Sequence, residues 1–325
     1  MKRVTLAALR GKERLAFSIV FLTVLIATLL VIHPRGASPA VITSWANQGV
    51  GVAFVAVGQT IVVLSGGIDI SIGAIMALAN CIASVWVNGS ALHAGVGVVL
   101  VLIAGALCGL VNGIVIVYGR IQPIVATLGT GAVYSGVALL VRPEPGGEIS
   151  SILSDLATGT VGRWVPASLL LLVGFVLLIW EPVRRALIGR TIYAAGSAEA
   201  AAFMSGLPLD TAKLLAYTLA GIFAALGGLF LGFQTLSGDA TIGMPYTLNS
   251  VAAVVLGGTS LAGGAGSVAG SIAGAFILGT IGNLMFFAGI PPLAQPLFDG
   301  LVLLAVVTLG ALGVIKTKSR IEVMQ

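Results

Sequence analysis

Long apolar runs, separated by short polar or glycine-rich intervals, occupy most of the chain. An uncharged apolar run of about 18 residues or more can cross the hydrocarbon core of a membrane as a helix. The pattern therefore predicts an all-α, polytopic membrane protein, a single transmembrane domain over residues 1–325 with about ten transmembrane helices. The expected spans are 15–32, 44–64, 72–88, 95–118, 123–141, 166–181, 214–236, 246–260, 266–288 and 295–315. Between 240 and 298 two or three crossings would fit, so the count there stays open.

The basic residues set the expected orientation. Several of them precede the first span, and basic residues prefer the cytoplasmic side of a membrane, so the N-terminus is placed in the cytoplasm. These residues are Lys2, Arg3, Arg10, Lys12 and Arg14. An even number of spans returns the C-terminus to the cytoplasm. The polar interval 182–213 then lies in the cytoplasm, and the polar interval 142–165 lies outside.

Composition supports the membrane assignment. The chain is 58% hydrophobic and only 8% charged, whereas a soluble protein of this length would carry roughly a quarter charged residues. Its cysteines, Cys81 and Cys108, lie inside apolar runs and are interpreted as core residues rather than a disulfide. Its histidines, His33 and His93, are far apart, so we expect no metal site.

The segment "SGGIDISIG", residues 65–73, places Asp69 in a long uncharged region. A carboxylate at membrane depth is costly and marks a functional site by default. Alternatively, Asp69 caps the amino end of the span 72–88 by accepting backbone N–H bonds. We favour a role in capping and gate structure over direct substrate contact and over proton or cation coupling.

Two glycine-bearing patterns indicate close helix packing and an internal repeat. GxxxG spacing at Gly105, Gly109 and Gly113, and again at residues 266, 270 and 274, favours tight internal packing over a dimerisation face. The segment "TIVVLSGGIDISIGAIMALA" (60–79) is echoed weakly by "AVVLGGTSLAGGAGSVAGSIAGAFILG" (253–279). Repeats of this kind occur in transporters, which often build a pathway from interrupted helices.

Neutral polar residues at membrane depth are the pathway candidates. Amides and hydroxyls can donate and accept hydrogen bonds without trapping an ion, which suits a neutral polyhydroxylated solute, although each could equally bond a neighbouring helix. The candidates are Gln59, Asn112, Gln122, Thr127, Tyr246 and Asn249. The chain contains no Walker GxxxxGK[ST] loop and no catalytic triad or paired-carboxylate arrangement, so we do not expect an enzyme.

The cytoplasmic interval contains the patterned stretch "GRTIYAAGSAEAAAFMSGLPLD" (189–210). "SAEAAAFM" predicts a short helix, with Ser197 as N-cap and Glu199 in the first turn. An exposed short helix between two spans would suit the docking of a soluble partner. The alternative is a loop helix that lies on the bilayer surface.

Four motifs in order resemble those of the permease subunits of bacterial sugar ABC importers, of the ribose-type branch. They are "GGIDISIG", "RIQPIVATLGT", "GRTIYAAGSAEAAAFMSGL" and "AAVVLGGTSLAGGAGSVAGSIAGA", and the resemblance extends from about residue 40 to 315. The chain departs from the family at Gly196, Ser197 and Ala198, where the family usually has "GGN". That departure bears on the contacts with the ATPase.

The resemblance implies a multi-pass protein of the bacterial inner membrane, in contact with lipid. It implies as partners a second permease, identical or paralogous, ABC ATPase subunits that hydrolyse ATP, a periplasmic sugar-binding protein and a sugar substrate. No cofactor in this chain and no nucleic acid are expected. It also implies two gate turns and a coupling segment within 182–213.

The residues assigned on this basis fall into three groups. The first gate turn contains Ser65, Gly66, Gly67, Asp69, Ser71 and Gly73, and the second contains Gly257, Gly258, Thr259, Ser260, Gly263 and Gly264. The coupling group is Gly189, Arg190, Gly196, Glu199, Ala200, Ala201, Ser205, Gly206 and Leu207.

Two alternatives remain at this point. An ion-coupled secondary transporter would use Asp69 as its coupling carboxylate and would need no partner, but no second intramembrane charge pairs with it. An ABC permease for branched-chain amino acids or nucleosides would share the general architecture. The neutral amides lean slightly towards a sugar.

Overall fold

The computed structural model describes residues 2–291 together with 294, 297, 298, 300, 301, 304 and 308, and side chains from residue 15 onward. Helices make up nearly all of its regular structure, which confirms the all-α prediction. They are α1 (Lys2–Ile32), α2 (Pro39–Leu64), α3 (Ile72–Trp86), α4 (Ala91–Val117), α5 (Pro123–Val141), α6 (Ser151–Thr158), α7 (Ala167–Phe175), the π-helical η1 (Val176–Trp180), α8 (Glu181–Arg185), α9 (Leu187–Ser197), α10 (Glu199–Met204), α11 (Leu209–Thr235), α12 (Met244–Leu256) and α13 (Val268–Phe287). Strands β1 (Thr160–Val161) and β2 (Val165–Pro166) form a small antiparallel hairpin.

Seven helical stretches in the described part of the chain are long and apolar enough to cross a membrane. They are residues 15–32 of α1, then α2, α4, α5, the continuous stretch α7–η1–α8, α11 and α13. The chain is therefore a multi-pass membrane protein. The span predicted at 295–315 lies mostly outside the described residues.

The predictions of full spans at 72–88 and 246–260 were wrong in extent. Helix α3 has 15 residues and α12 has 13. At 1.5 Å per residue, α12 is about 20 Å long, shorter than the ~30 Å hydrocarbon core. Apolarity alone could not reveal this, because the segments that flank both helices are themselves apolar or glycine-rich.

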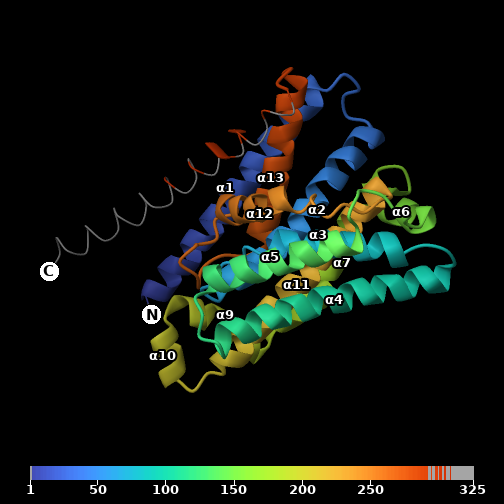
Figure 1. Cartoon of the computed structure of the whole chain (residues 1–325). Helices are drawn as coiled ribbons and strands as arrows, with labels where there is room; N and C mark the ends of the chain where they lie inside the picture. Colours follow the sequence, from blue (N-terminus) through green and yellow to red (C-terminus); the bar gives the residue numbers. More distant parts are fainter. Residues whose placement is uncertain are drawn as a thin grey trace.

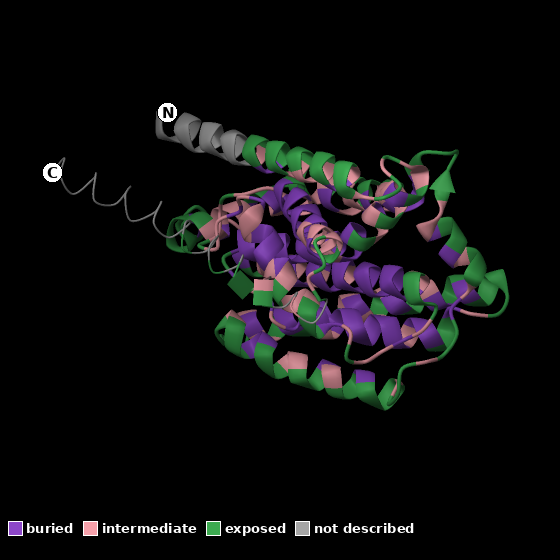
Figure 2. Ribbon diagram, turned by 90° about the horizontal axis from the view of Figure 1, so that it is seen from above, coloured by how far each residue is buried: buried purple, intermediate pink, exposed green. Residues whose placement is uncertain are grey.

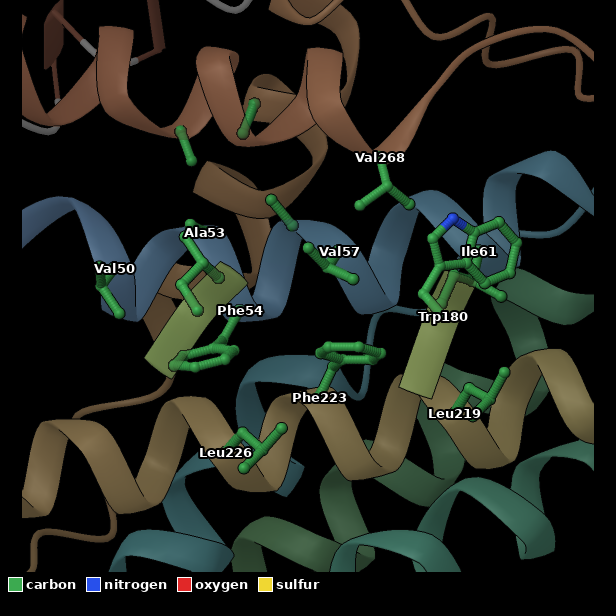
Figure 3. Close-up of a cluster of buried hydrophobic side chains, with 14 of the residues drawn as sticks. Val50, Ala53, Phe54, Val57, Ile61, Trp180, Leu219, Phe223, Leu226 and Val268 are labelled. Carbon is green, nitrogen blue, oxygen red and sulfur yellow. The ribbon is translucent and has the colours of Figure 1, made fainter. Parts of the chain in front are cut away.

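Helices α2 and α11 form the centre of the molecule. Buried residues concentrate in the middle of the structure, while the helices at its periphery are mostly exposed (Figure 2). In the largest core cluster, Phe54 and Val57 of α2 face Phe223 and Leu226 of α11 (Figure 3). Because lipid is as apolar as these side chains, van der Waals packing rather than exclusion from water holds such a core together.

Glycines permit the closest helix contacts, as the GxxxG spacing predicts. A Cβ atom on Gly109 would clash with the Tyr217 carbonyl group of α11. Likewise, a Cβ on Gly270 would clash with the Gly257 carbonyl group, and one on Gly274 with that of Ala253. Both glycine patterns therefore serve packing within the chain, which confirms that interpretation.

The molecule has two distinguishable ends. The start of α1 lies at the same end as α9 and α10, and α6 lies at the opposite end (Figure 1). We call them the α10 end and the α6 end. The N-terminus and the interval 182–213 thus lie at one end of the molecule, and the location of that end in the cytoplasm stays a prediction.

Candidate functional site

The first turn, residues 65–71, begins where α2 ends in a left-handed glycine. Gly66 has φ +89°. Its N–H donates to the Val63 carbonyl oxygen at 2.9 Å, and the Gly67 N–H donates to the Val62 carbonyl oxygen at 3.2 Å. This is the Schellman pattern of helix termination, which requires the left-handed conformation that glycine adopts most readily.

Asp69 is fully buried within this turn, and its carboxylate is hydrogen-bonded. Oδ1 accepts bonds from the Ser71 N–H at 2.8 Å and from the Ser71 hydroxyl at 2.6 Å. Oδ2 accepts a longer bond, 3.4 Å, from Nδ2 of Asn112 in α4. The capping prediction needs correction, because Ser71 is itself the N-cap of α3 and Asp69 orders the turn that precedes the helix.

The hydrogen-bond network extends from Asp69 to α4 and α5. Asn112 donates a 2.7 Å bond to the Ser71 hydroxyl, and its Oδ1 lies 3.1 Å from the Tyr134 hydroxyl of α5. Thr127 of α5 accepts the Ile70 N–H at 3.0 Å. The pathway candidates Asn112 and Thr127, both fully buried, therefore tie the first turn to two neighbouring helices in this structure.

The second turn, residues 257–267, begins with the same backbone cap. Gly258 has φ +80°. Its N–H donates to the Val255 carbonyl oxygen at 2.9 Å, and the Thr259 N–H donates to that of Val254 at 3.1 Å. The two halves of the proposed repeat thus share a backbone motif as well as the letters "VVL" before it.

Side chains of the second turn hold it against α13. The Thr259 hydroxyl accepts the Ser267 N–H at 3.3 Å and lies 3.4 Å from the Ser271 hydroxyl of α13. Within the turn, the Ser260 N–H donates to the Ala265 carbonyl oxygen at 2.8 Å. In α3, Gly73 packs so closely on Gly243 that a Cβ would clash with the Gly243 carbonyl oxygen. The chain just before α12 is thereby pressed against the start of α3.

Four glycines bring the two turns and the coupling segment together. We call Gly66, Gly196, Gly263 and Gly264 the glycine junction. A Cβ on Gly263 would lie 2.9 Å from Gly196 Cα and 3.0 Å from Gly66 Cα. The Gly264 N–H donates to the carbonyl oxygen of Leu64, the last residue of α2, at 3.2 Å. The segments approach so closely here that a Cβ on Gly196, Gly263 or Gly264 would clash with a neighbouring segment.

The coupling segment contains two complete helices beside α8, namely α9 and α10, at the α10 end. The prediction of a helix at "SAEAAAFM" is correct, but Ser197 is not its N-cap. Ser197 is the last residue of α9, and its hydroxyl donates to the Tyr193 carbonyl oxygen at 2.8 Å, while Ala198 precedes α10. On α10 the side chains of Phe203 and Met204 are 74% and 87% exposed.

The other coupling candidates surround these apolar side chains. Glu199 accepts a 2.5 Å bond from Lys213 of α11. Gly206 ends α10 in the left-handed region, with φ +72°. Of the remaining candidates, Arg190, Ala200, Ala201 and Ser205 are exposed, Leu207 is half-buried and Gly189 is buried beneath α8.

The pathway candidates do not lie together. Gln122 lines a cavity of about 530 Å³ at the α10 end, together with Ser65, Gly66 and Gly67 of the first turn. We call it the α10-end cavity. Gln59 lines neither this cavity nor the one described next. It is fully buried in α2, and neither of its amide atoms has a hydrogen-bond partner among the described residues.

Tyr246 and Asn249 line a different cavity, of about 630 Å³, between α2, α11, α12 and α13. Its wall also contains three amides that the sequence analysis missed, Gln48, Gln234 and Asn283. We call it the amide cavity. Each of the three is an uncharged polar residue within an apolar span, so the criterion that selected Asn249 would have found them too.

Residue Thr247 connects the floor of the amide cavity to the first turn. Its hydroxyl donates to the Ile70 carbonyl oxygen at 3.4 Å, and it lies between the cavity-lining residues Tyr246 and Asn249. The first turn therefore contacts α12 beside the amide cavity, and it lines the α10-end cavity directly. Among the described residues no group of histidine, cysteine, aspartate or glutamate could hold a metal ion.

Comparison with known proteins assigns the family. A family model described as "Branched-chain amino acid transport system / permease component" matches residues 41–307. The chain belongs to this family. The match includes both turns, the coupling segment and every residue of the amide cavity, so the site described above lies wholly within the family domain.

The relatives of this permease-family chain include named importers. It is 33% identical to the ribose import permease protein of Bacillus subtilis strain 168 over 296 residues, which is 89% of this chain and 90% of the relative. It is also 33% identical to the ribose import permease protein of Escherichia coli K12, over 89% and 91% of the two chains. The autoinducer 2 import system permease protein of Photorhabdus luminescens is 32% identical over 79% of each. No solved structure gives a significant match.

Proposed function

We propose that the chain is a membrane-spanning permease subunit of an ATP-driven sugar importer in the bacterial inner membrane. The observation that supports this function most directly is the 33% identity to ribose import permeases over 89% of the chain. The chain has no nucleotide-binding loop, so hydrolysis belongs to a separate ATPase subunit. A second permease subunit and a periplasmic sugar-binding protein at the α6 end complete the proposed assembly.

The ATPase docks on α10 in this proposal. Phe203 and Met204 expose large apolar side chains on a helix of only six residues at the predicted cytoplasmic end. Exposed apolar groups beside charged ones, here Glu199 and Lys213, are typical of a surface that a partner covers. A movement of α10 would pass through α9 to Gly196, and from the glycine junction to both turns.

The first turn acts as the gate in this scheme. Its residues 65–67 line the α10-end cavity, while Ile70 contacts α12 beneath the amide cavity. Asp69, Ser71 and Asn112 hold the turn in one shape. The first turn, residues 65–71, belongs both to the glycine junction and to the hydrogen-bond network of Asp69. Displacement of the coupling segment can therefore move the turn and change which of the two cavities it closes.

The hydrogen bonds of Asp69 argue against the ion-coupled alternative. A coupling carboxylate must exchange its proton or cation with water during each cycle, but Asp69 is 0% exposed and lines neither cavity. The amino-acid alternative lacks support for a different reason. None of the described residues that line the amide cavity is charged, so the ammonium and carboxylate groups of such a solute would find no ionic partner among them.

Purification of the tagged chain from mild detergent, followed by reconstitution in liposomes, tests the function. We expect an ATPase with a Walker loop to copurify, and we expect uptake of D-ribose, the probe suggested by the relatives, to require ATP and the binding protein. A chain that purifies alone and moves solute under an ion gradient would overturn the proposal.

A further inference from the structure

The amide cavity combines uncharged polar groups with an apolar wall. Its polar residues are Gln48, Gln234, Tyr246, Asn249 and Asn283, and its lining, within the described part of the chain, contains no charged residue. Its volume, about 630 Å³, falls within the range of ~300–1,000 Å³ that is usual for small-molecule sites. Carboxamides present donors and acceptors without a net charge, which suits hydroxyl groups better than ions.

The carboxamides keep most of their hydrogen-bonding capacity unused. Gln48 donates one bond to the Ser44 hydroxyl at 3.3 Å, and Gln234 donates one to the Asn47 carbonyl oxygen at 3.0 Å. Within the part of the chain that the structure describes, no hydrogen bond reaches the side chain of Asn249 or Asn283. With respect to the described residues, all four carboxamide oxygens and two of the NH₂ groups therefore remain available to a solute.

A second cavity continues from the amide cavity towards the α6 end. It has a volume of about 700 Å³ and shares Gln48 and Gln234 with the amide cavity. Its other lining residues are uncharged too, and they include Thr158 and Thr160 at the end of α6 and the start of β1. The two cavities together make an uncharged polar route from the α6 end to Asn249, two residues after Thr247, which contacts the first turn.

We propose that this route is part of a solute-binding pathway, in which Gln48, Gln234, Asn249 and Asn283 bind a neutral polyhydroxylated solute through their carboxamides. The inference rests on the proposed function and adds to it the residues that the solute meets. Gln48 and Gln234 receive the solute first, because they belong to both cavities. Asn249 and Asn283 hold it above the first turn until the turn opens.

Thiol labelling tests whether the route contains water. In a background that carries Cys81→Ala and Cys108→Ala, the variants Asn249→Cys and Asn283→Cys are treated in intact cells with a charged, membrane-impermeant methanethiosulfonate. We expect both to react, since the reagent needs a wet path from the α6 end. The control Ile103→Cys, at a 49% exposed apolar position of α4, should not react. Absence of labelling at position 249 or 283 would overturn the route.

Uptake by the reconstituted complex tests whether the solute uses the route. Labelled Asn283→Cys and the charged variant Asn283→Asp should each reduce D-ribose uptake at least about tenfold relative to the unmodified complex, because the adduct obstructs the route and the aspartate lacks the NH₂ donor of the carboxamide. Asn283→Gln, which keeps the carboxamide, should retain most uptake. Unchanged uptake after complete labelling would refute the pathway. Loss of ATP dependence in the wild-type complex would instead refute the proposed function, while the labelling pattern still reports on the route.

Discussion

Gly66 and Gly258 occupy the same position at the ends of two helices that lie far apart in the chain. Both have left-handed backbone angles, φ +89° and +80°. Both donate to a carbonyl oxygen three residues earlier, that of Val63 or Val255, at 2.9 Å in each case. The two turns of the site thus start from one backbone motif, and from there each diverges to its own side-chain contacts.

Substitution of Gly66 should separate backbone strain from steric clash. A Cβ at this position would lie 3.4 Å from Gly196 Cα, an ordinary contact, so the cost of Gly66→Ala arises from the left-handed angle. We expect a loss of about 1–2 kcal/mol in stability, and a smaller loss for Gly66→Asn, because asparagine tolerates this conformation. Thermal unfolding in detergent measures both. Gly95→Ala, in an open position of α4, is the control that should cost nothing.

Gly196→Ala should damage the glycine junction by clash alone. The added Cβ would overlap the Leu64 carbonyl oxygen and lie 2.5 Å from the Gly264 nitrogen, and backbone atoms cannot rotate away. We expect a stability loss of about 1–3 kcal/mol and a loss of ATP-driven uptake beyond the loss of folded protein. The control Gly174→Ala, which meets no atom within 4 Å, should behave as wild type. If Gly196→Ala shows normal ATP-driven uptake per folded protein, the glycine junction does not transmit movement from the coupling segment to the turns.

The sequence predicts the helices of this molecule better than it predicts their lengths and contacts. Apolar runs located the long spans, since a membrane helix needs only length and apolarity. The short helices α3 and α12 were overestimated, because glycine-rich turns such as 257–267 are as uncharged as the helices that they end. Termination there depends on backbone hydrogen bonds, which hydropathy does not report.

The sequence predicted which segments form the candidate site, but it did not predict which of their residues contact one another. The first turn, the second turn and the coupling segment were found as motifs, yet their convergence at Gly196 depends on tertiary packing. Asn112 was selected for its polarity, but only the structure shows that it bonds Ser71 and Asp69. Gln48 and Asn283 were missed, although they carry the same signal as Asn249.

Asp69→Asn should weaken the first turn rather than abolish transport. The remaining carbonyl oxygen can still accept the bonds from Ser71, but the new NH₂ group would face the NH₂ group of Asn112, and two donors cannot bond. We expect a stability loss of about 1–3 kcal/mol with partial uptake.

The reciprocal double variant provides the decisive comparison. Combining Asp69→Asn with Asn112→Asp restores a donor opposite an acceptor. The loss of stability in the double variant should therefore be smaller than the sum of the losses in the two single variants. Tyr134, which lies 3.1 Å from Asn112 Oδ1, can still donate to the new carboxylate. If the single variant Asp69→Asn folds normally but loses all uptake, and the double variant does not recover it, a charge-dependent role for Asp69 is favoured instead.

Removal of the exposed apolar side chains on α10 should weaken ATPase binding without affecting the fold. Phe203 is 74% exposed, so Phe203→Ser removes little packing within this chain. At the centre of a partner interface the same change typically costs about 2 kcal/mol or more, and we therefore expect affinity for the ATPase to fall at least about tenfold. Copurification and surface-immobilised titration of the ATPase measure the change.

A matched variant and a charge variant complete this test. Trp164→Ser removes a 50% exposed apolar side chain in the hairpin between β1 and β2, on the opposite end of the molecule, and should leave ATPase affinity unchanged. Glu199→Gln breaks an ion pair whose carboxylate is 60% exposed, so its stability should change by less than about 1 kcal/mol, while any loss of ATPase affinity should diminish at high salt. Normal ATPase binding by Phe203→Ser would contradict docking on α10 and would favour the alternative, in which α10 lies on the bilayer surface.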